Sequence, residues 1–415
     1  MVESHLKASQ RLATASQAKL GTISSFAATQ AAWRFYANEK TSVAKLSEPL
    51  LTASCNGIAE FCKDYALIVH DWSGLSYGNH VSKTDRKTLH GSQQGYELQS
   101  SIALSDQNGL PLGVLVQNIS TKNGIWSSYQ GVELQEEQEH LQELAKRVQW
   151  LEKQAINKAQ VHIVDREGDA VEWLRACPNS QWLIRCRQTS KVDFSGKTYS
   201  VQELAKKMDY SQQAREVTYK GKIAYQIIAH CKVDVVRSAR PKRLRTAKKQ
   251  TIEGTPFSAQ LVVSRVIDID GKLLAEWYLL SNVFSASAET IATWYYWRWQ
   301  IECFFKLLKQ QGLQLEDWQQ ETGLAIAKRL LVASQACVLV WQLQHQNTPE
   351  ANEMKQFLVR LTGRQMKKKR PITSSALLEG VWLFLTIMDT LDHYSLSQLE
   401  QFKKGVYAFW GGKDV

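Results

Sequence analysis

The stretch Tyr65-Ala66-Leu67-Ile68-Val69-His70-Asp71 decides the fold class of this 415-residue chain. An apolar run of this length, bounded by polar and turn-forming residues, is typical of a strand buried on both faces. The run ends at Asp71, and the loop Trp72 to Tyr77 follows it. We therefore predict a buried strand with an acidic side chain at its end.

The same strand pattern recurs downstream, interleaved with helical patterns. Turn residues between the next two apolar runs predict a hairpin. A 3.6-residue apolar periodicity predicts a long helix after it. A short strand then ends at Asp165, so a second acidic residue follows a buried strand. The expected elements are strands at Leu98–Leu104 and Leu112–Val116, a helix at Glu133–Lys158, a strand at Val161–Val164, a helix at Asp169–Arg175 and a strand at Trp182–Arg185.

This order predicts an α/β protein with several regions. We expect an N-terminal helical region at 1–60, the first part of an α/β core at 61–187, a β-rich insertion at 188–282, the rest of the core at 283–345 and a helical C-terminal region at 346–415. The 188–282 region alternates apolar and polar residues, as half-buried strands do. Basic runs at 237–249 and 360–370 are interpreted as solvated loops or as surfaces for a nucleic-acid backbone.

The charge balance favours an anionic partner. Lys and Arg number 51 against 40 Asp and Glu, a net charge of +11, and nucleic acid is the commonest partner of such proteins. The apolar fraction of 44% excludes wholesale disorder. Neither an uninterrupted apolar run long enough to span a membrane nor a secretory signal is visible. Seven irregularly spaced Cys residues and no phosphate-binding loop favour reduced thiols in a cytoplasmic protein.

One helix carries the most chemical information. In the predicted helix Thr293–Lys309, five residues share an arc of about 80° at about 100° per residue. They are Tyr295, Arg298, Glu302, Lys306 and Lys309. A solvated stripe on a buried helix is the alternative interpretation. A carboxylate among three cations and a phenol also suits a site that holds a metal ion and phosphate oxygens.

A metal site needs further carboxylates, and Asp71 and Asp165 are the candidates. Ends of strands in α/β sheets are where sites are built, although a single such Asp is commonly a helix cap or a turn residue. Together with Glu302 they form an all-oxygen set that favours Mg²⁺ or Mn²⁺ over zinc.

The spacing Tyr295-x2-Arg298-x3-Glu302-x6-Lys309 resembles the Tyr-Arg-Glu-Lys motif of the insertion sequence 4 family of DDE transposases. Asp165-Arg166-Glu167-Gly168-Asp169 is similar to the second-Asp motif of that family, with Gly in place of Ala. His70 to Tyr77 resembles the first-Asp motif, and Ala31 to Tyr36 resembles an N-terminal stretch of these enzymes.

The resemblance implies a ribonuclease H-like catalytic core interrupted by a β-rich insertion before the catalytic Glu. It implies that Asp71, Asp165 and Glu302 are the catalytic triad and bind two Mg²⁺ ions, with Mn²⁺ as a substitute. It also implies a homodimer on double-stranded DNA, at transposon ends and target, in the bacterial nucleoid. The dimer surface would be the C-terminal helices from about residue 376.

The family further implies cut-and-paste movement through a hairpin with a flipped base. Trp277 would stack on that base, with a core Trp as the alternative interpretation. Tyr295, Arg298 and Lys309 would contact the nearby phosphate, and Lys306 and Arg185 would be further DNA contacts.

Two other function classes remain open from the sequence. The first is a catalytically silent DNA-binding or inhibitory transposase derivative, because residues 1–26 contain only Lys7, Arg11 and Lys19 as basic residues. The second is a glycosidase with paired carboxylates, which the net charge and the cations around Glu302 disfavour.

Overall fold

Strand β1 (Tyr65–Ser76) lies at the centre of the computed structural model, and its residues Ala66 to Val69 are fully buried. It pairs antiparallel with β3 (Gln94–Ser105) on one side and parallel with β6 (Ala159–Val164) on the other. Burial on both faces explains the unbroken apolar run of the sequence. The structure describes residues 25–131, 134–210, 215–219, 221–239, 253–310, 312–364 and 372–409.

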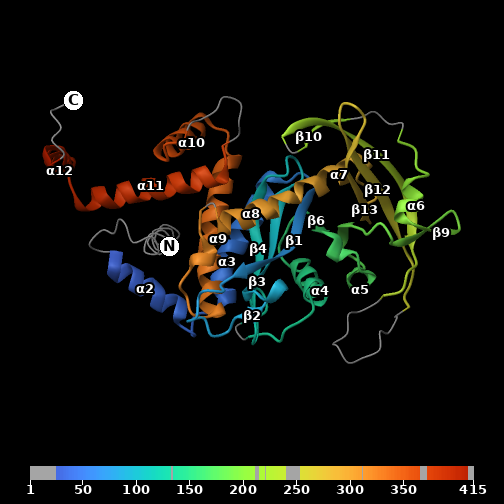
Figure 1. The fold of residues 1–415 in the computed structure, drawn as a ribbon, viewed down its shortest axis with the longest axis horizontal. Coiled ribbons are helices and arrows are strands. Elements are labelled where there is room, and N and C mark those ends of the chain that lie inside the picture. Colours follow the sequence, from blue (N-terminus) through green and yellow to red (C-terminus); the bar gives the residue numbers. More distant parts are fainter. Residues whose placement is uncertain are drawn as a thin grey trace.

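One large mixed sheet organises the protein (Figure 1). Within the described residues it has 13 strands, in the order β5-β4-β3-β1-β6-β7-β13-β12-β11-β8-β9, with β2 on β3 and β10 on β11. Strand β7 is parallel to β6, and β13 closes against β7 in the antiparallel sense. The remaining strands are β2 (Lys87–Thr88), β4 (Pro111–Thr121), β5 (Gly124–Ser127), β7 (Gln181–Arg185), β8 (Lys191–Phe194), β9 (Lys197–Ser200), β10 (Arg215–Tyr219), β11 (Lys222–Val235), β12 (Phe257–Ile267) and β13 (Leu273–Ser281).

Helices cover both faces of this sheet. One apolar cluster joins the sheet to α7, α8 and α9, and a second joins its opposite face to α4, α5 and α6. The helices are α2 (Ser25–Ala37), α3 (Val43–Phe61), α4 (His140–Leu151), α5 (Val171–Ala176), α6 (Val201–Ala205), α7 (Ala288–Trp297), α8 (Trp299–Lys309), α9 (Gly323–His345), α10 (Pro349–Leu361), α11 (Ser374–His393) and α12 (Leu396–Phe409), with 3₁₀ turns at His90–Ser92, Arg166–Gly168 and Leu315–Asp317. The architecture is a mixed α/β fold, as predicted.

The first strand does not end at Asp71, which corrects the prediction. The parallel pairing of β1 with β6 ends at His70 opposite Val164, but its antiparallel pairing with β3 continues to Ser76. Asp71 therefore stands where β1 loses one neighbour and keeps the other. Asp165 directly follows β6, as expected.

Two helix predictions also need correction. The helix expected over Glu133–Lys158 is only His140–Leu151, because Gln135 is hydrogen-bonded to the backbone of Ile125 instead. The helix expected over Thr293–Lys309 is divided at Arg298 into α7 and α8. Arg298 N bonds Tyr295 O, and Ile301 N bonds Arg298 O, both at 3.1 Å. This three-residue spacing tightens the turn and shifts the register of side chains across the break.

Within the described ranges, two helices, α9 and α11, are long and apolar enough to cross a membrane by length and composition. In α9, 83% of the apolar window is buried inside the protein, which identifies it as a core helix; in α11 the share is 28%. Helix α11 projects from the body of the molecule (Figure 1). Residues 1–24 and most of the two basic runs, at 240–252 and 365–371, lie outside the described residues.

The predicted hairpin forms between β3 and β4, and its Gly109 cannot carry a side chain. Its φ of +69° is left-handed, and a Cβ would lie 2.2 Å from the Trp297 ring. We expect Gly109→Ala to lower the free energy of unfolding by about 1–3 kcal/mol, measured by urea denaturation. Gly196→Ala is the control, because Gly196 has a φ of +75° with nothing nearby. Equal losses in both variants would show that the contact with Trp297 is irrelevant.

Candidate active site

Three carboxylates from distant parts of the chain converge on one guanidinium group. Arg298 Nη1 donates to Asp71 Oδ2 at 2.9 Å. Its Nη2 lies 3.7 Å from Asp165 Oδ2 and 3.7 Å from Glu302 Oε1. Asp71 comes from β1, Asp165 from the end of β6 and Glu302 from the first turn of α8. The structure therefore brings together the three acidic residues that the sequence singled out.

The sheet order explains how these residues meet. Strands β1, β6, β7 and β13 are neighbours in the sheet. They place Asp71, Asp165, Arg185 and Trp277 toward the same end of these strands. Arg185, the last residue of β7, lies opposite Leu279 in β13. Helix α8 packs against β1 and brings Glu302 to the same end of the strands. Residues at the carboxyl ends of parallel strands commonly form sites for this reason.

Tyr295 joins the cluster from α7. Its hydroxyl donates to Asp165 Oδ1 at 2.8 Å, and its ring lies 6.5 Å from that of Trp277 between centroids. Arg185 Nη1 lies 3.7 Å from Asp165 Oδ1. The structure thus places Tyr295 and Arg185 beside Asp165, and Trp277 beside Tyr295.

The two lysines of the predicted stripe separate. Lys309 donates to the carbonyl oxygen of Gly74 and lies 3.8 Å from Glu316 Oε1. Lys306 lies over the ring of Trp299, 4.8 Å from its centroid, and forms no ion pair with the three carboxylates in the part of the chain that the structure describes. Both lysines lie on α8, after the break at Arg298, and they contact different partners.

The carboxyl groups differ in their pKa values. Burial raises the pKa of Asp71 to about 6, although the charge of Arg298 opposes this. Burial acts in the same direction on Asp165, but Arg298 and the Tyr295 hydroxyl hold its pKa below the usual value. Burial and the charge of Asp165 raise the pKa of Tyr295, so its hydroxyl remains a hydrogen-bond donor.

A match between this sequence and a known protein family identifies the family. A family model described as "Transposase DDE domain" matches residues 63–341, well over half of the chain. The chain belongs to the family of transposase DDE domains. No curated protein sequence matches it.

A solved structure of the piggyBac transposase synaptic complex with hairpin DNA is similar at 10% identity and a TM-score of 0.31. The match covers 87% of this chain and 62% of that one, so the transposase spans less than two thirds of the length of that relative.

DDE transposases use divalent metal ions, and the donor set here suits them by chemistry. Asp71, Asp165 and Glu302 offer only carboxylate oxygens, the ligands of hard cations. Across the described residues, however, no group of three or more His, Cys, Asp and Glu side chains stands close enough to hold one ion. The guanidinium of Arg298 lies within ion-pair distance of each carboxylate and supplies positive charge among them.

The sequence did not indicate the bridge that His140 forms next to Trp72, the residue after Asp71. His140, at the start of α4, lies 2.9 Å from Glu97 Oε1 and 2.7 Å from Glu167 Oε1. Its ring stacks on Trp72, with centroids 5.0 Å apart and planes at 15°. Trp72 N in turn donates to Asp71 Oδ1 at 2.9 Å. Because Glu97 and Glu167 lie far from His140 in sequence, no local pattern could have shown this bridge.

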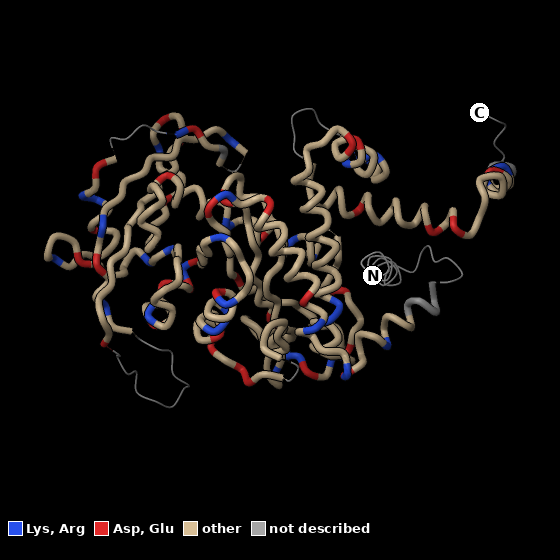
Figure 2. Tube along the Cα trace, turned by 180° about the vertical axis from the view of Figure 1, so that it is seen from behind, with Lys and Arg blue, Asp and Glu red and all other residues tan. Residues whose placement is uncertain are grey.

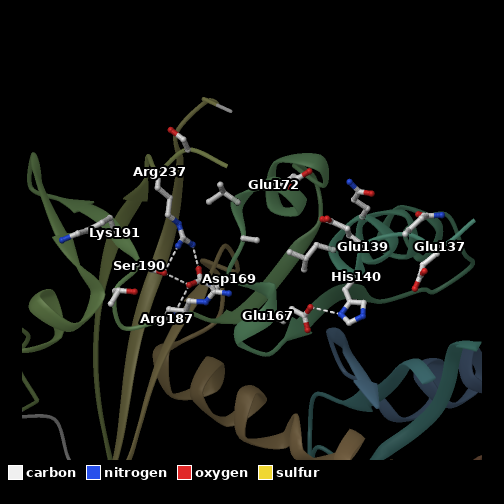
Figure 3. Close-up of a pocket in the computed structure, with 17 residues that line it drawn as sticks. Glu137, Glu139, His140, Glu167, Asp169, Glu172, Arg187, Ser190, Lys191 and Arg237 are labelled. Atoms are coloured by element: carbon white, nitrogen blue, oxygen red, sulfur yellow. Dashed lines mark hydrogen bonds and ion pairs between the residues drawn. The ribbon is translucent and has the colours of Figure 1, made fainter. Parts of the chain in front are cut away.

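A cavity of about 1120 Å³ opens beside this bridge (Figure 3), and Asp71, Asp165 and Glu302 are not among the residues that line it. Glu167 and His140 line one part of it, and Asp169 lines another. Asp169 is buried and accepts hydrogen bonds from Arg187 N, Ser190 Oγ and Arg237. The second acid of the Asp165–Asp169 motif is therefore a structural residue that fixes the turn after Asp165.

The His140 bridge predicts a pH dependence of stability. Burial opposes the charged ring, but hydrogen bonds to Glu167 and Glu97 outweigh it and raise the pKa of His140 from 6.5 to about 9. A raised pKa means that the native state holds the proton more tightly, so this stabilisation is complete below pH 6.5 and is lost as the pH rises to about 9.

We expect His140→Gln to flatten the decline of the urea midpoint over this pH range. His90→Gln is the control, because His90 is exposed. If the wild-type protein and His140→Gln show parallel pH profiles, the bridge does not contribute in this way.

Proposed function

We propose that this transposase cleaves and rejoins DNA at the ends of its own insertion sequence, with Asp71, Asp165 and Glu302 as its metal-binding catalytic residues. The convergence of these three carboxylates around Arg298 carries the proposal. Bound Mg²⁺ ions, or Mn²⁺ in their place, would activate the attacking water or 3′-hydroxyl and stabilise the leaving oxygen of the displacement. The protein residues would orient the DNA and need form no covalent bond with it.

A ribonuclease H-like core is the fold that the strand order favours. Strands β4, β3 and β1 are antiparallel neighbours, and β6 and β7 follow parallel to β1. We propose residues 61–187 and 283–345 as this core, and 188–282 as an insertion whose strands extend the same sheet. Residues 1–60 and 346–415 would be the helical terminal regions.

The residues around the carboxylates suit a DNA strand. Tyr295, Arg298 and Lys309 combine a phenol and two cations, which bind phosphate oxygens well. Trp277 is half-buried beside Tyr295, so its indole would stack on a flipped base during a hairpin step. Arg185 would hold the same strand, and Lys306, which lies over the Trp299 ring, would contact DNA further along α8.

The finer family assignment rests on the spacing of Tyr295, Arg298, Glu302 and Lys309. We propose that the chain belongs to the insertion sequence 4 branch of the DDE transposases, where it is similar to the transposon five transposase. The protein would be located in the bacterial cytoplasm, associated with the nucleoid. All seven cysteines are free, in keeping with a reducing compartment.

The C-terminal helices suit a second copy of the chain better than DNA. Helix α11 contains no Lys or Arg, and Figure 2 shows it as mostly uncharged with a few acidic positions. Its side chains Leu383, Ile387, Met388 and Leu391 are each 38–42% exposed. The acidic positions of this surface repel DNA, whereas its apolar side chains can pack against the same surface of a second copy. We therefore propose it as the homodimer interface of the synaptic complex.

The test is a cleavage assay with the full chain. The inverted repeats that flank the gene are placed in a supercoiled plasmid and incubated with the purified protein, with and without Mg²⁺. We expect Mg²⁺-dependent double-strand breaks at the repeats, with hairpin ends. Tight binding to the repeats without any nicking in Mg²⁺ or Mn²⁺ would favour the catalytically silent derivative instead.

A further inference from the structure

Arg298 holds a position that no other cation of the described residues shares. It pairs with Asp71, Asp165 and Glu302, whereas Arg185 pairs only with Asp165. Its side chain is 10% exposed, and its guanidinium also lies 5.9 Å from the Tyr295 ring. Three negative charges thus share one arginine, in the same space where a divalent cation would need their oxygens.

The partners of this guanidinium are of a kind that can be exchanged. A hydrogen bond to the Asp71 carboxylate, two longer ion pairs and a ring contact hold it. Arginine binds phosphate oxygens with the same planar geometry that it uses for carboxylates. The neighbouring side chains Tyr296 and Trp299 are 48% and 54% exposed, so the segment that carries Arg298 borders the solvent from which DNA would approach.

We propose that Arg298 competes with divalent cations for the carboxylates of Asp71, Asp165 and Glu302, and that DNA binding relieves this competition. In the DNA-free protein the guanidinium occupies the cluster, so metal ions bind weakly. A DNA phosphate that draws Arg298 away leaves the carboxylates to the metal. This inference rests on the proposed function, and it makes metal loading conditional on the presence of DNA.

The coupling has to be reciprocal. If DNA strengthens metal binding by a given factor through Arg298, the metal strengthens DNA binding by the same factor. A protein that works in this way is protected from hydrolysing DNA before a strand is seated beside Arg298. The coupling should disappear when the guanidinium is removed.

The experiment measures Mn²⁺ binding to the metal-stripped full chain, from the electron paramagnetic resonance signal of free Mn²⁺. We expect Arg298→Ala to bind Mn²⁺ roughly tenfold more tightly than the wild-type protein without DNA. Arg185→Ala is the matched control: it also removes a nearby arginine charge, but one that contacts a single carboxylate, so its effect should be much smaller. A duplex of the flanking inverted repeat should strengthen Mn²⁺ binding to the wild-type protein and not to Arg298→Ala.

Further variants keep the outcomes distinct. Arg298→Lys keeps the charge but not the planar fork, and should bind Mn²⁺ with intermediate affinity even if Arg298→Ala does not fold. If Glu302→Gln abolishes Mn²⁺ binding while the Arg298 variants bind Mn²⁺ like the wild-type protein, the proposed competition by Arg298 is wrong, but the proposed metal site is supported. If Glu302→Gln binds Mn²⁺ as the wild-type protein does, both the inference and the proposed metal site are overturned.

Discussion

Glu302→Gln is expected to reduce metal-dependent DNA cleavage by about a thousandfold while DNA binding is retained. The amide has nearly the shape of the carboxylate but lacks the charge that would hold a divalent ion. A metal ion contributes several kcal/mol of charge stabilisation in phosphoryl transfer, and each 1.36 kcal/mol is about tenfold in rate. The measurement compares single-turnover cleavage rates on the repeat-bearing plasmid with gel-shift affinities for the same repeats.

The matched control for this prediction is Glu289→Gln. Glu289 lies in the first turn of α7 and is exposed, so this change removes the same charge from the adjoining helix but not from the cluster around Arg298. We expect wild-type cleavage from it. Full cleavage by Glu302→Gln would show that Glu302 is not one of the catalytic residues.

Arg147→Met is expected to cost about 3–5 kcal/mol of unfolding free energy, because it leaves a buried carboxylate without its cation. Arg147 and Glu143 lie on α4 with side chains 0% and 1% exposed. Glu143 also accepts from Asn118 Nδ2 at 2.8 Å and from Tyr129 OH at 2.9 Å. Arg147 Nη1 reaches Ser101 Oγ at 3.1 Å in β3. Urea denaturation followed by tryptophan fluorescence measures the loss.

A surface ion pair provides the comparison for this second prediction. Lys191 and Glu203 are 54% and 60% exposed and 3.5 Å apart, so Lys191→Met should change stability by less than about 1 kcal/mol. The double variant Glu143→Leu with Arg147→Met should recover part of the loss, because it buries no unpaired charge. A loss no larger for Arg147→Met than for Lys191→Met would contradict the expected cost of an unpaired carboxylate.

Local patterns predicted the elements that depend on local chemistry. The apolar run of β1, the hairpin of β3 and β4 with its Gly109, and the strand before Asp165 are confirmed. Each depends on side-chain alternation or turn residues within about ten positions. The predictions were wrong where a residue pairs with a part of the chain that is distant in sequence. Strand β1 continues past Asp71 because it pairs with β3, and the segment before α4 is not helical because Gln135 forms hydrogen bonds with the backbone of Ile125.

For the candidate site too, some features could be predicted from the sequence and others only from the structure. The sequence selected Asp71, Asp165, Glu302 and the residues of the α7–α8 segment, because acids after buried strands and a fixed helical spacing are visible without any structure. The catalytic role of these residues stays a prediction. The placement of Asp71 and Asp165 beside Arg298 required the sheet order, which no spacing shows, whereas Arg298 and Glu302 have the four-residue spacing of neighbours on one helix face.

The sequence by itself therefore determined the chemistry that is available: a basic transposase with three carboxylates and a set of cations at defined spacings. Only the tertiary structure decided which of these groups meet. Arg298 reaches all three acids, Lys306 turns to Trp299, and His140 bridges two glutamates from different elements. The physical reason is that periodicity follows from local backbone geometry, whereas contacts between remote elements depend on how sheets and helices pack.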